Sequence, residues 1–293
     1  MATNAPAAAY PVDLLALIED YLEALDFGVD ERAARLVEAM RYSLLAGGKR
    51  IRPVLALATA RSLGADPGAV LPMAAALELI HTYSLIHDDL PAIDDDTLRR
   101  GRPTCHVAFG EDVAILAGDG LFAEAFRVLL TRQAGTPAVV LAALREVAAA
   151  TGVQGMVGGQ YMDVAGCARD DDDLRTLHEL KTGRLIEAAV VCGAMLSGAG
   201  DAAPYRAFAR ELGLLFQIVD DILDESGDEE ELGKSVGKDR IQDKVTYVSR
   251  FGMAEADRMA TAAHERALVR LGALPGDTGD LSALTTYIRL RRQ

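Results

Sequence analysis

One long apolar stretch, residues 69–87, most constrains the fold of this chain. Its sequence, "AVLPMAAALELIHTYSLIH", places apolar residues on almost every side of a helical wheel. A helix that is apolar nearly all round is stable only when other elements surround it. The stretch therefore predicts a central, buried helix. Pro91 cannot lie inside an undisturbed helix, so this helix should end or kink near Asp88.

The rest of the chain predicts further helices around this one. Leu14, Ile18 and Leu22 recur at helical spacing, and no segment shows a persuasive alternating strand pattern. Breaks rich in glycine, proline and acidic residues fall at 133–137, 197–204, 225–239 and 274–280. We therefore predict an all-α bundle of ten or more helices, formed by a single domain over residues 13–293 after a flexible segment at 1–12. A helical protein of two domains is the weaker alternative.

Composition excludes several classes of function. The chain has 293 residues, a net charge of −14 and a pI near 4.8, which argues against nucleic acid as a partner. Its three cysteines, Cys105, Cys167 and Cys192, are far apart and indicate a reducing, cytoplasmic setting with no disulfide framework. No signal peptide is recognised, and no window approaches the about 18 uncharged apolar residues of a membrane span. We expect a soluble cytoplasmic protein.

Two acidic clusters extend apolar helices at their C-terminal ends. The first is "HDDLPAIDDD" (87–96), and the second is "DDILD" (220–224), preceded by Gln217. The helix dipole disfavours carboxylates at that end, so a compensating cation is implied. Mg²⁺ suits closely packed carboxylates and completes its coordination with water and substrate phosphates. The alternative is a pair of solvated acidic turns, which we accept for 169–174 and 227–232 only.

Basic residues at glycine-containing turns complement the acidic clusters. They lie in "GGKRIRP" (47–53), "LRRGRPT" (98–104), "LKTGRL" (180–185) and "LGKSVGKD" (232–239), with Lys244 further on. Lysines and arginines at such turns suit phosphate groups, although each one alone is more often a surface residue. Carboxylates for Mg²⁺, cations for phosphate and apolar helices together predict a site for a diphosphate with a hydrocarbon body.

The motifs "GGKRIRP", "HTYSLIHDDLPAIDDDTLRRGRPTCH", "LKTGRLIEAA" and "FQIVDDILD" resemble those of the trans-isoprenyl diphosphate synthases, in the same order, from about residue 14 to the end. With the "LPAI" insertion, the chain most resembles bacterial farnesyl diphosphate synthases. The resemblance implies helices around a deep central cavity, a homodimer, and Mg²⁺-dependent head-to-tail condensation of isopentenyl diphosphate with dimethylallyl or geranyl diphosphate. Terpene cyclases share the acidic motif but lack "GGKRIRP".

The resemblance also implies roles for individual residues. Isopentenyl diphosphate would be held by Lys49, Arg52, His81 and Arg100, and the allylic diphosphate by Arg99, Lys181, Lys234 and Lys244. Two or three Mg²⁺ ions would be bound by Asp88, Asp89, Asp94, Asp220, Asp221 and Asp224. Lys181, Thr182 and Gln217 would act in catalysis. Helix geometry alone does not choose between Asp94 and Asp95, and without the resemblance His81 would be interpreted as a core histidine.

Product length depends on the helix that precedes Asp88. Ser84 is one turn before Asp88 on the same face, and Tyr83 occupies the position that limits chain length in the family. The tyrosine resembles that of bacterial farnesyl diphosphate synthases, which implies a C15 product. A C20 product, as in geranylgeranyl diphosphate synthases, is the alternative, and Tyr83 would then only pack between helices. A non-catalytic partner subunit of a prenyl synthase is a third possibility, disfavoured because both acidic clusters are intact.

Overall fold

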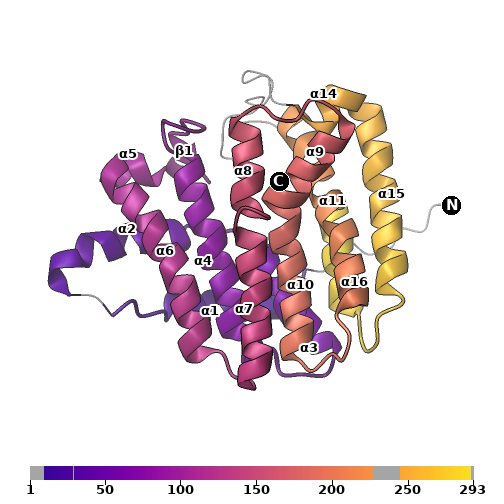
Figure 1. Cartoon of the computed structure of the whole chain (residues 1–293), viewed down its shortest axis with the longest axis horizontal. Coiled ribbons are helices and arrows are strands. Elements are labelled where there is room, and N and C mark those ends of the chain that lie inside the picture. The colour runs from indigo at the N-terminus through magenta and orange to yellow at the C-terminus, as the bar shows by residue number, and fades with distance from the viewer. Residues whose placement is uncertain (1–9, 29, 227–244, 292–293) are drawn as a thin grey trace.

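The structure is a computed structural model that describes residues 10–28, 30–226 and 245–291. These residues form an α-helical bundle, with α5 and α6 at one side and α15 and α16 at the other (Figure 1). The helices are α1 (Val12–Glu23), α2 (Ala34–Leu44), α3 (Ile51–Ser62), α4 (Leu71–Asp88), α5 (Cys105–Phe109), α6 (Glu111–Arg132), α7 (Pro137–Thr151), α8 (Met156–Val164), α9 (Asp171–His178), α10 (Arg184–Leu196), α11 (Ala203–Ser226), α14 (Tyr247–Phe251), α15 (Met253–Leu271) and α16 (Gly279–Leu290). The all-α prediction of ten or more helices is confirmed.

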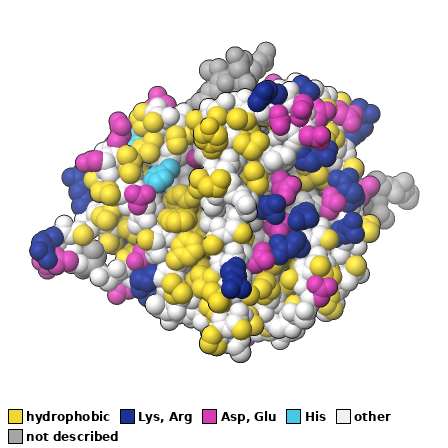
Figure 2. All heavy atoms as spheres, in the orientation of Figure 1, with side chains coloured by type: hydrophobic (Ala, Val, Ile, Leu, Met, Phe, Trp, Pro, Cys, Tyr) yellow, Lys and Arg dark blue, Asp and Glu magenta, His cyan; other side chains and the backbone are white. Residues whose placement is uncertain are grey.

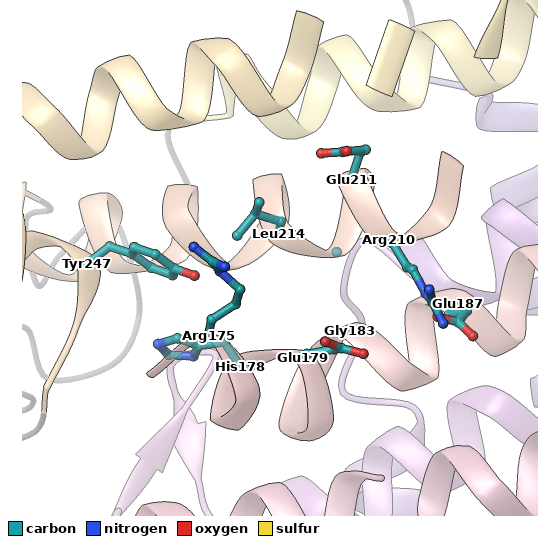
Figure 3. Close-up of a pocket in the computed structure, with 10 residues that line it drawn as sticks. Arg175, His178, Glu179, Gly183, Glu187, Arg210, Glu211, Leu214 and Tyr247 are labelled. Atoms are coloured by element: carbon teal, nitrogen blue, oxygen red, sulfur yellow. The ribbon is translucent and has the colours of Figure 1, made fainter. Parts of the chain in front are cut away.

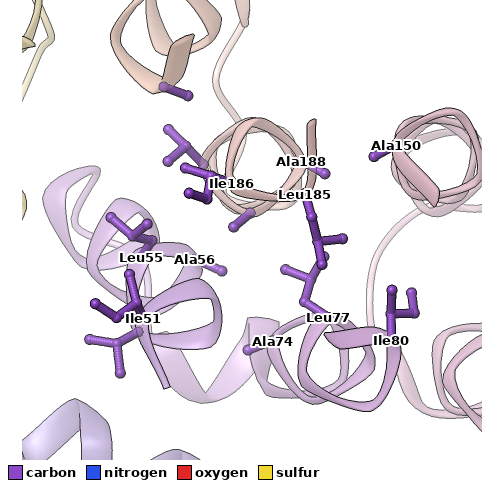
Figure 4. Packing of buried hydrophobic residues seen from close by; sticks show 14 of the residues in the cluster. Ile51, Leu55, Ala56, Ala74, Leu77, Ile80, Ala150, Leu185, Ile186 and Ala188 are labelled. Atoms are coloured by element: carbon purple, nitrogen blue, oxygen red, sulfur yellow. The ribbon is translucent and has the colours of Figure 1, made fainter. Parts of the chain in front are cut away.

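The stretch at 69–87 forms the central helix that its apolar sequence predicts. Most of α4 is buried, and the helix ends at Asp88, before Pro91. In Figure 4, Leu77 of α4 and Leu185 of α10 point toward one another, and α3 packs beside both helices. Apart from Asp88 at its end, the only carboxylate of this helix is Glu78, which is buried and accepts a 2.7 Å hydrogen bond from Arg50. Burial of α4 therefore places its C-terminal acids inside the bundle.

The helix ends follow the breaks seen in the sequence. Thr136 caps α7 by accepting a hydrogen bond from the N–H of Val139, and Pro137 takes the first helical position. Asp170 caps α9 through the N–H groups of Asp172 and Asp173, as expected for the acidic run at 169–174. The second run, at 227–232, lies outside the described residues.

Two details differ from the sequence prediction. A short antiparallel hairpin, β1 (Leu98–Arg99) with β2 (Arg102–Pro103), follows the first acidic cluster. It was missed because two-residue strands carry no alternating pattern. Short 3₁₀ helices also lie at Glu31–Ala33 and Pro67–Val70.

The expectation that no segment has the length and composition of a membrane span is wrong for two segments. Pro67–Asp88 and Pro137–Val164 are long and apolar enough. For the first, 72% of the apolar window is buried in the bundle, which explains its composition without a membrane. In the second, 33% of the window is buried, and the segment crosses the break between α7 and α8.

Candidate active site

A cavity of about 460 Å³ is lined by residues of α4 and α11, the helices that carry the two acidic clusters. Asp88, the last residue of α4, and Asp220, on α11, both line it, although they are far apart in the sequence. The lining residues are Arg52, His81, Tyr83, Ser84, Leu85, His87, Asp88, Ile93, Arg99, Arg100, Met156, Val157, Gln160, Lys181, Thr182, Phe216 and Asp220. Tertiary packing thus brings carboxylates, basic side chains and apolar side chains to one site.

Asp88 is the carboxylate most affected by its surroundings. Burial raises the pKa of Asp88 to about 6, against the lowering influence of Lys181, and the charge of Asp94 raises it further. The N–H of Asp94 donates to the Asp88 carbonyl oxygen at 2.9 Å. Asp95 is exposed and has a positive φ of 50°. The structure therefore places Asp94 within electrostatic reach of Asp88 and turns the chain at Asp95.

Asp89 does not line the cavity but orients a residue that does. Its buried carboxylate accepts hydrogen bonds from Arg99, with Nε at 2.8 Å and Nη2 at 2.5 Å. Arg99 also lies 3.8 Å from Asp96. A guanidinium held by two nitrogens on one carboxylate is fixed in direction. Asp89 therefore holds Arg99 at the cavity wall.

The three acids of the second cluster have different surroundings. Asp220 faces the cavity and pairs with Arg291 at 2.9 Å. Asp221 is buried and accepts hydrogen bonds from the N–H of Tyr247 and the side-chain amide of Gln217, both at 2.7 Å. Asp221, Gln217 and the half-buried Asp224 are not among the cavity-lining residues. The structure thus brings only Asp220 of this set to the cavity.

Of the four residues predicted to hold isopentenyl diphosphate, three line the cavity and Lys49 does not. Arg52, His81 and Arg100 line the cavity, and burial is the main cause that lowers the pKa of both arginines. Burial, followed by the charge of Arg52, lowers the pKa of His81 well below 6.5, so His81 is neutral and can donate one hydrogen bond. Lys49 is exposed, with its ammonium 5.1 Å from the centre of the Tyr287 ring. Lys234, Lys238 and Lys244 lie outside the described residues.

Comparison with known proteins identifies the family. The family model for polyprenyl synthetase matches residues 33–271. The chain belongs to the polyprenyl synthetase family. It is 49% identical to a farnesyl diphosphate synthase of Geobacillus stearothermophilus, over 80% of each chain. It is also 49% identical to geranylgeranyl pyrophosphate synthase 7 of Arabidopsis thaliana, over 83% of this chain and 74% of that one.

A solved structure supports the same assignment. The geranyltransferase from Helicobacter pylori, complexed with magnesium and isoprenyl diphosphate, superposes with a TM-score of 0.83 at 30% identity, over 98% of this chain and 96% of that one. The chain described here is therefore a prenyltransferase with the helical fold of isoprenoid synthases. Its cavity at Asp88 and Asp220 is the candidate active site of this polyprenyl synthetase.

In this polyprenyl synthetase, a π-helix at Glu179–Gly183 joins α9 to α10 and presents Lys181 and Thr182 to the cavity. Such wide turns often mark functional sites. The Lys181 ammonium lies 2.5 Å from the carboxylate of Asp163 on α8. Gly159 lets α8 approach the π-helix closely, because a Cβ atom on this residue would come within 2.2 Å of the backbone nitrogen of Lys181. Asp163 and Gly159 together fix Lys181 at the cavity wall.

Sequence reasoning missed several cavity residues of the synthetase. Gln160 lines the cavity, and neither the oxygen nor the nitrogen of its buried side-chain amide has a hydrogen-bond partner among the described residues. Ile93, Met156 and Phe216 add apolar walls. The signal for the α8 residues was "GGQYMD" (158–163), in which two glycines precede a polar residue and an acid at helical spacing.

The apolar part of the cavity includes Tyr83. The residue is 8% exposed, and its ring packs edge-on against Phe122 of α6, with ring centres 5.0 Å apart. Phe126 lies behind Phe122 at 5.2 Å. Ser84 also lines the cavity, and its hydroxyl donates to the His81 carbonyl oxygen at 2.9 Å. Two aromatic side chains of α6 therefore support Tyr83 beside the cavity.

Proposed function

We propose that the protein condenses isopentenyl diphosphate with dimethylallyl or geranyl diphosphate, head to tail, to give farnesyl diphosphate. The single observation that carries this proposal is the shared cavity. It has Asp88 and Asp220 on its walls, basic side chains beside them and Tyr83 among its apolar residues. By name, one relative is a farnesyl diphosphate synthase and the structural neighbour is a geranyltransferase, and both names describe the transfer of a prenyl group. This is the function that the geometry supports best.

The carboxylates fit Mg²⁺. Among the described residues, no three His, Cys, Asp or Glu side chains gather closely enough to hold an ion by themselves. That arrangement agrees with the preference of Mg²⁺ for one or two protein carboxylates together with water and phosphate oxygens. Asp88 and Asp220 would hold the ions, with Asp94 beside Asp88. Bound Mg²⁺ would neutralise charge on the departing diphosphate.

The basic residues divide into two groups around this site. Arg99, held by Asp89, and Lys181, held by Asp163, would bind the allylic diphosphate and stabilise the negative charge that grows as its C–O bond breaks. Arg52, Arg100 and the neutral His81 would hold isopentenyl diphosphate. Arg99 and Lys181 are each fixed by a neighbouring carboxylate before substrate arrives, so these two cations need little reorganisation during the reaction.

The remaining residues protect the allylic cation. Ile93, Met156 and Phe216 exclude water, and the oxygens of Thr182 and Gln160 supply fixed dipoles. The double bond of isopentenyl diphosphate attacks the cation and forms the new C–C bond. A proton is then lost from the product cation to the departing diphosphate, which regenerates a double bond. The side-chain amide of Gln217 donates a hydrogen bond to Asp221, so Gln217 would act indirectly by holding that buried carboxylate.

Tyr83 supports the C15 product, because a bulky ring in the apolar part of the cavity limits the space for a longer chain. The alternative is a C20 product, which the relatives named geranylgeranyl synthases favour. Pure protein incubated with Mg²⁺, dimethylallyl diphosphate and labelled isopentenyl diphosphate gives products that can be sized after dephosphorylation. A dominant C15 alcohol is expected. A C20 alcohol would overturn the length assignment alone, and no elongation would overturn the condensation.

We also propose that the synthetase forms a homodimer. Large apolar residues are exposed on α6 and α8, including Leu116, Val157 and Tyr161, and the loop residue Val153 is 81% exposed. Figure 2 shows apolar side chains gathered over the half of the molecule that contains these helices. Patches of this kind often mark protein interfaces. Light scattering coupled to gel filtration should give twice the 31.1 kDa mass of the chain, and the monomer mass would exclude the dimer.

A further inference from the structure

A second cavity shares the π-helix with the active site. It has a volume of about 180 Å³, close to that of six water molecules in the liquid and enough for one small ring. Lys181 and Thr182 face the active site, whereas His178, Glu179 and Gly183 line the second cavity, with residues of α11 and α14 (Figure 3). The condensation reaction uses none of the side chains that line this second cavity.

Part of the second cavity is lined by bare backbone. Gly213 of α11 meets Gly183 of the π-helix so closely that a Cβ atom on Gly213 would come within 3.0 Å of the Gly183 Cα. The apolar side chain of Leu214 also lines the cavity and projects from α11 (Figure 3). An apolar ring can therefore rest against Leu214 and the two glycines.

Two buried polar side chains lining the cavity lack hydrogen-bond partners among the described residues, although His178 Nε2 lies 3.8 Å from the Asp221 carboxylate. The Tyr247 hydroxyl and both ring nitrogens of His178 have no hydrogen bond within the described part of the chain, although the residues are 3% and 9% exposed. Buried polar atoms without a hydrogen-bond partner are costly, so a ligand or water that pairs with them would stabilise the site. In Figure 3 the Tyr247 hydroxyl and the Arg175 guanidinium point toward one another. Arg175 can only donate, so the pair can be bridged by an acceptor.

The cavity is lined by three carboxylates and two guanidinium groups, and of these charges Arg175 has the weakest ion pair. The other four charged lining residues already have close partners: Arg210 with Glu187 at 3.1 Å, Glu179 with Arg184 at 3.1 Å and Glu211 with Arg266 at 2.9 Å. Arg175 has one ion pair among the described residues, with the exposed Asp172 at 3.8 Å. The Arg175 side chain is itself 65% exposed, and exposed pairs at this distance are weak, so of the two lining arginines Arg175 is the one less compensated by a carboxylate.

We propose that this cavity is a second ligand site, for a small aromatic carboxylate. Its carboxylate would accept hydrogen bonds from Arg175 and Tyr247, and its ring would rest on Leu214 and the two glycines. A phosphate dianion suits the cavity less well, because it would add a second negative charge near Glu179 and Glu187. The site differs from the condensation cavity in both position and ligand chemistry.

The test uses benzoate as the probe and the full chain as it exists. Ligand-observed NMR of benzoate is recorded with Mg²⁺, first without and then with excess inorganic diphosphate. The diphosphate would occupy the condensation site. Benzoate is expected to bind with a Kd of about 1 mM, the range for a ligand of this size, and the neutral isostere benzamide about tenfold more weakly. Loss of the benzoate signal on adding diphosphate would place the probe in the condensation cavity and overturn the proposal.

Matched variants locate the site. Tyr247→Phe removes only the hydroxyl, and Arg175→Gln removes only the charge, so each should weaken benzoate binding about fivefold or more. Tyr161→Phe on exposed α8 and Arg132→Gln at the end of α6 are the controls and should leave binding unchanged. Equal binding by all four variants, or no binding up to about 20 mM, would leave ordered water as the occupant and overturn the proposal.

Discussion

The ammonium of Lys181 lies 2.5 Å from the carboxylate of Asp163, although the two residues belong to different helices. Lys181 lines the cavity, whereas Asp163 stands behind it on α8. A lysine has four rotatable bonds, so an unpaired ammonium would sample many positions. The carboxylate therefore sets where the positive charge meets a diphosphate.

We expect Asp163→Asn to weaken this positioning. The amide keeps the shape but loses the charge, so kcat/KM for the allylic diphosphate should fall about tenfold, while KM for isopentenyl diphosphate stays within about twofold. Steady-state kinetics with each substrate varied in turn would measure both effects. Asp172→Asn on exposed α9 is the control. An equal loss for both substrates would show that Asp163 does not act through Lys181.

Adjacent acids on α11 should give opposite phenotypes. Asp221→Ala leaves the Tyr247 N–H and the Gln217 amide without their acceptor, so the free energy of unfolding should fall by about 2–4 kcal/mol. Asp220→Ala loses one pair with Arg291, in which the Asp220 side chain is 48% exposed, and should cost no more than about 1 kcal/mol. Urea unfolding would measure both changes.

The same two variants should differ in the Mg²⁺ concentration that their activity requires. Asp220→Ala should raise the Mg²⁺ concentration for half-maximal activity by about tenfold or more, since a cavity carboxylate is lost. Asp221→Ala, assayed well below its unfolding temperature, should keep the wild-type requirement. An altered Mg²⁺ requirement in Asp221→Ala with normal stability would show that Asp221 binds the ion directly.

Tyr83 should control product length through its ring. Tyr83→Ala opens the apolar part of the cavity, so products should shift from C15 to C20 or longer, whereas Tyr83→Phe keeps the ring and should keep C15. Phe122→Leu removes the edge-on support at 5.0 Å while retaining bulk, and should yield a mixture dominated by C15. Product sizing after dephosphorylation checks all three. An unchanged product length in Tyr83→Ala would show that another part of the cavity limits chain length.

Asp88 should make the metal-free protein less stable as the pH rises. Its folded pKa, about 6, exceeds the unfolded value of 3.8, so the folded state binds more protons between these values. The stabilising contribution is complete below about pH 4 and is lost as the pH rises through about 6. In the presence of a chelator, the unfolding temperature of Asp88→Asn should therefore decline less over this pH range than that of the wild type. Parallel curves for the two proteins would contradict the shift.

Metal binding should follow the same titration. Mg²⁺ requires the ionised carboxylate, so its affinity should fall as the pH drops below about 6, and binding near that pH should release protons. Calorimetry in two buffers of different ionisation enthalpy would detect the release. His106→Gln is a suitable control, since His106 lies near Thr104, outside the cavity-lining set.

The sequence by itself determined the central helix, the all-α architecture and the position of the acids at helix ends. These features are local. An apolar stretch without a polar face must be buried, and Pro91 must end the helix that carries Asp88. The motifs and their order were also sufficient to recognise the family, because reading them does not require knowing which helices are neighbours.

Only the tertiary structure decided which side chains share the cavity. Spacing along α11 places Asp220 and Asp221 side by side, but it does not reveal that Tyr247, 26 residues later, binds Asp221 and leaves Asp220 to the cavity. The pairing of Asp163 with Lys181 likewise depends on packing between α8 and a π-helix. Helical periodicity fixes the face of a residue, whereas the neighbour that meets that face is set by long-range packing.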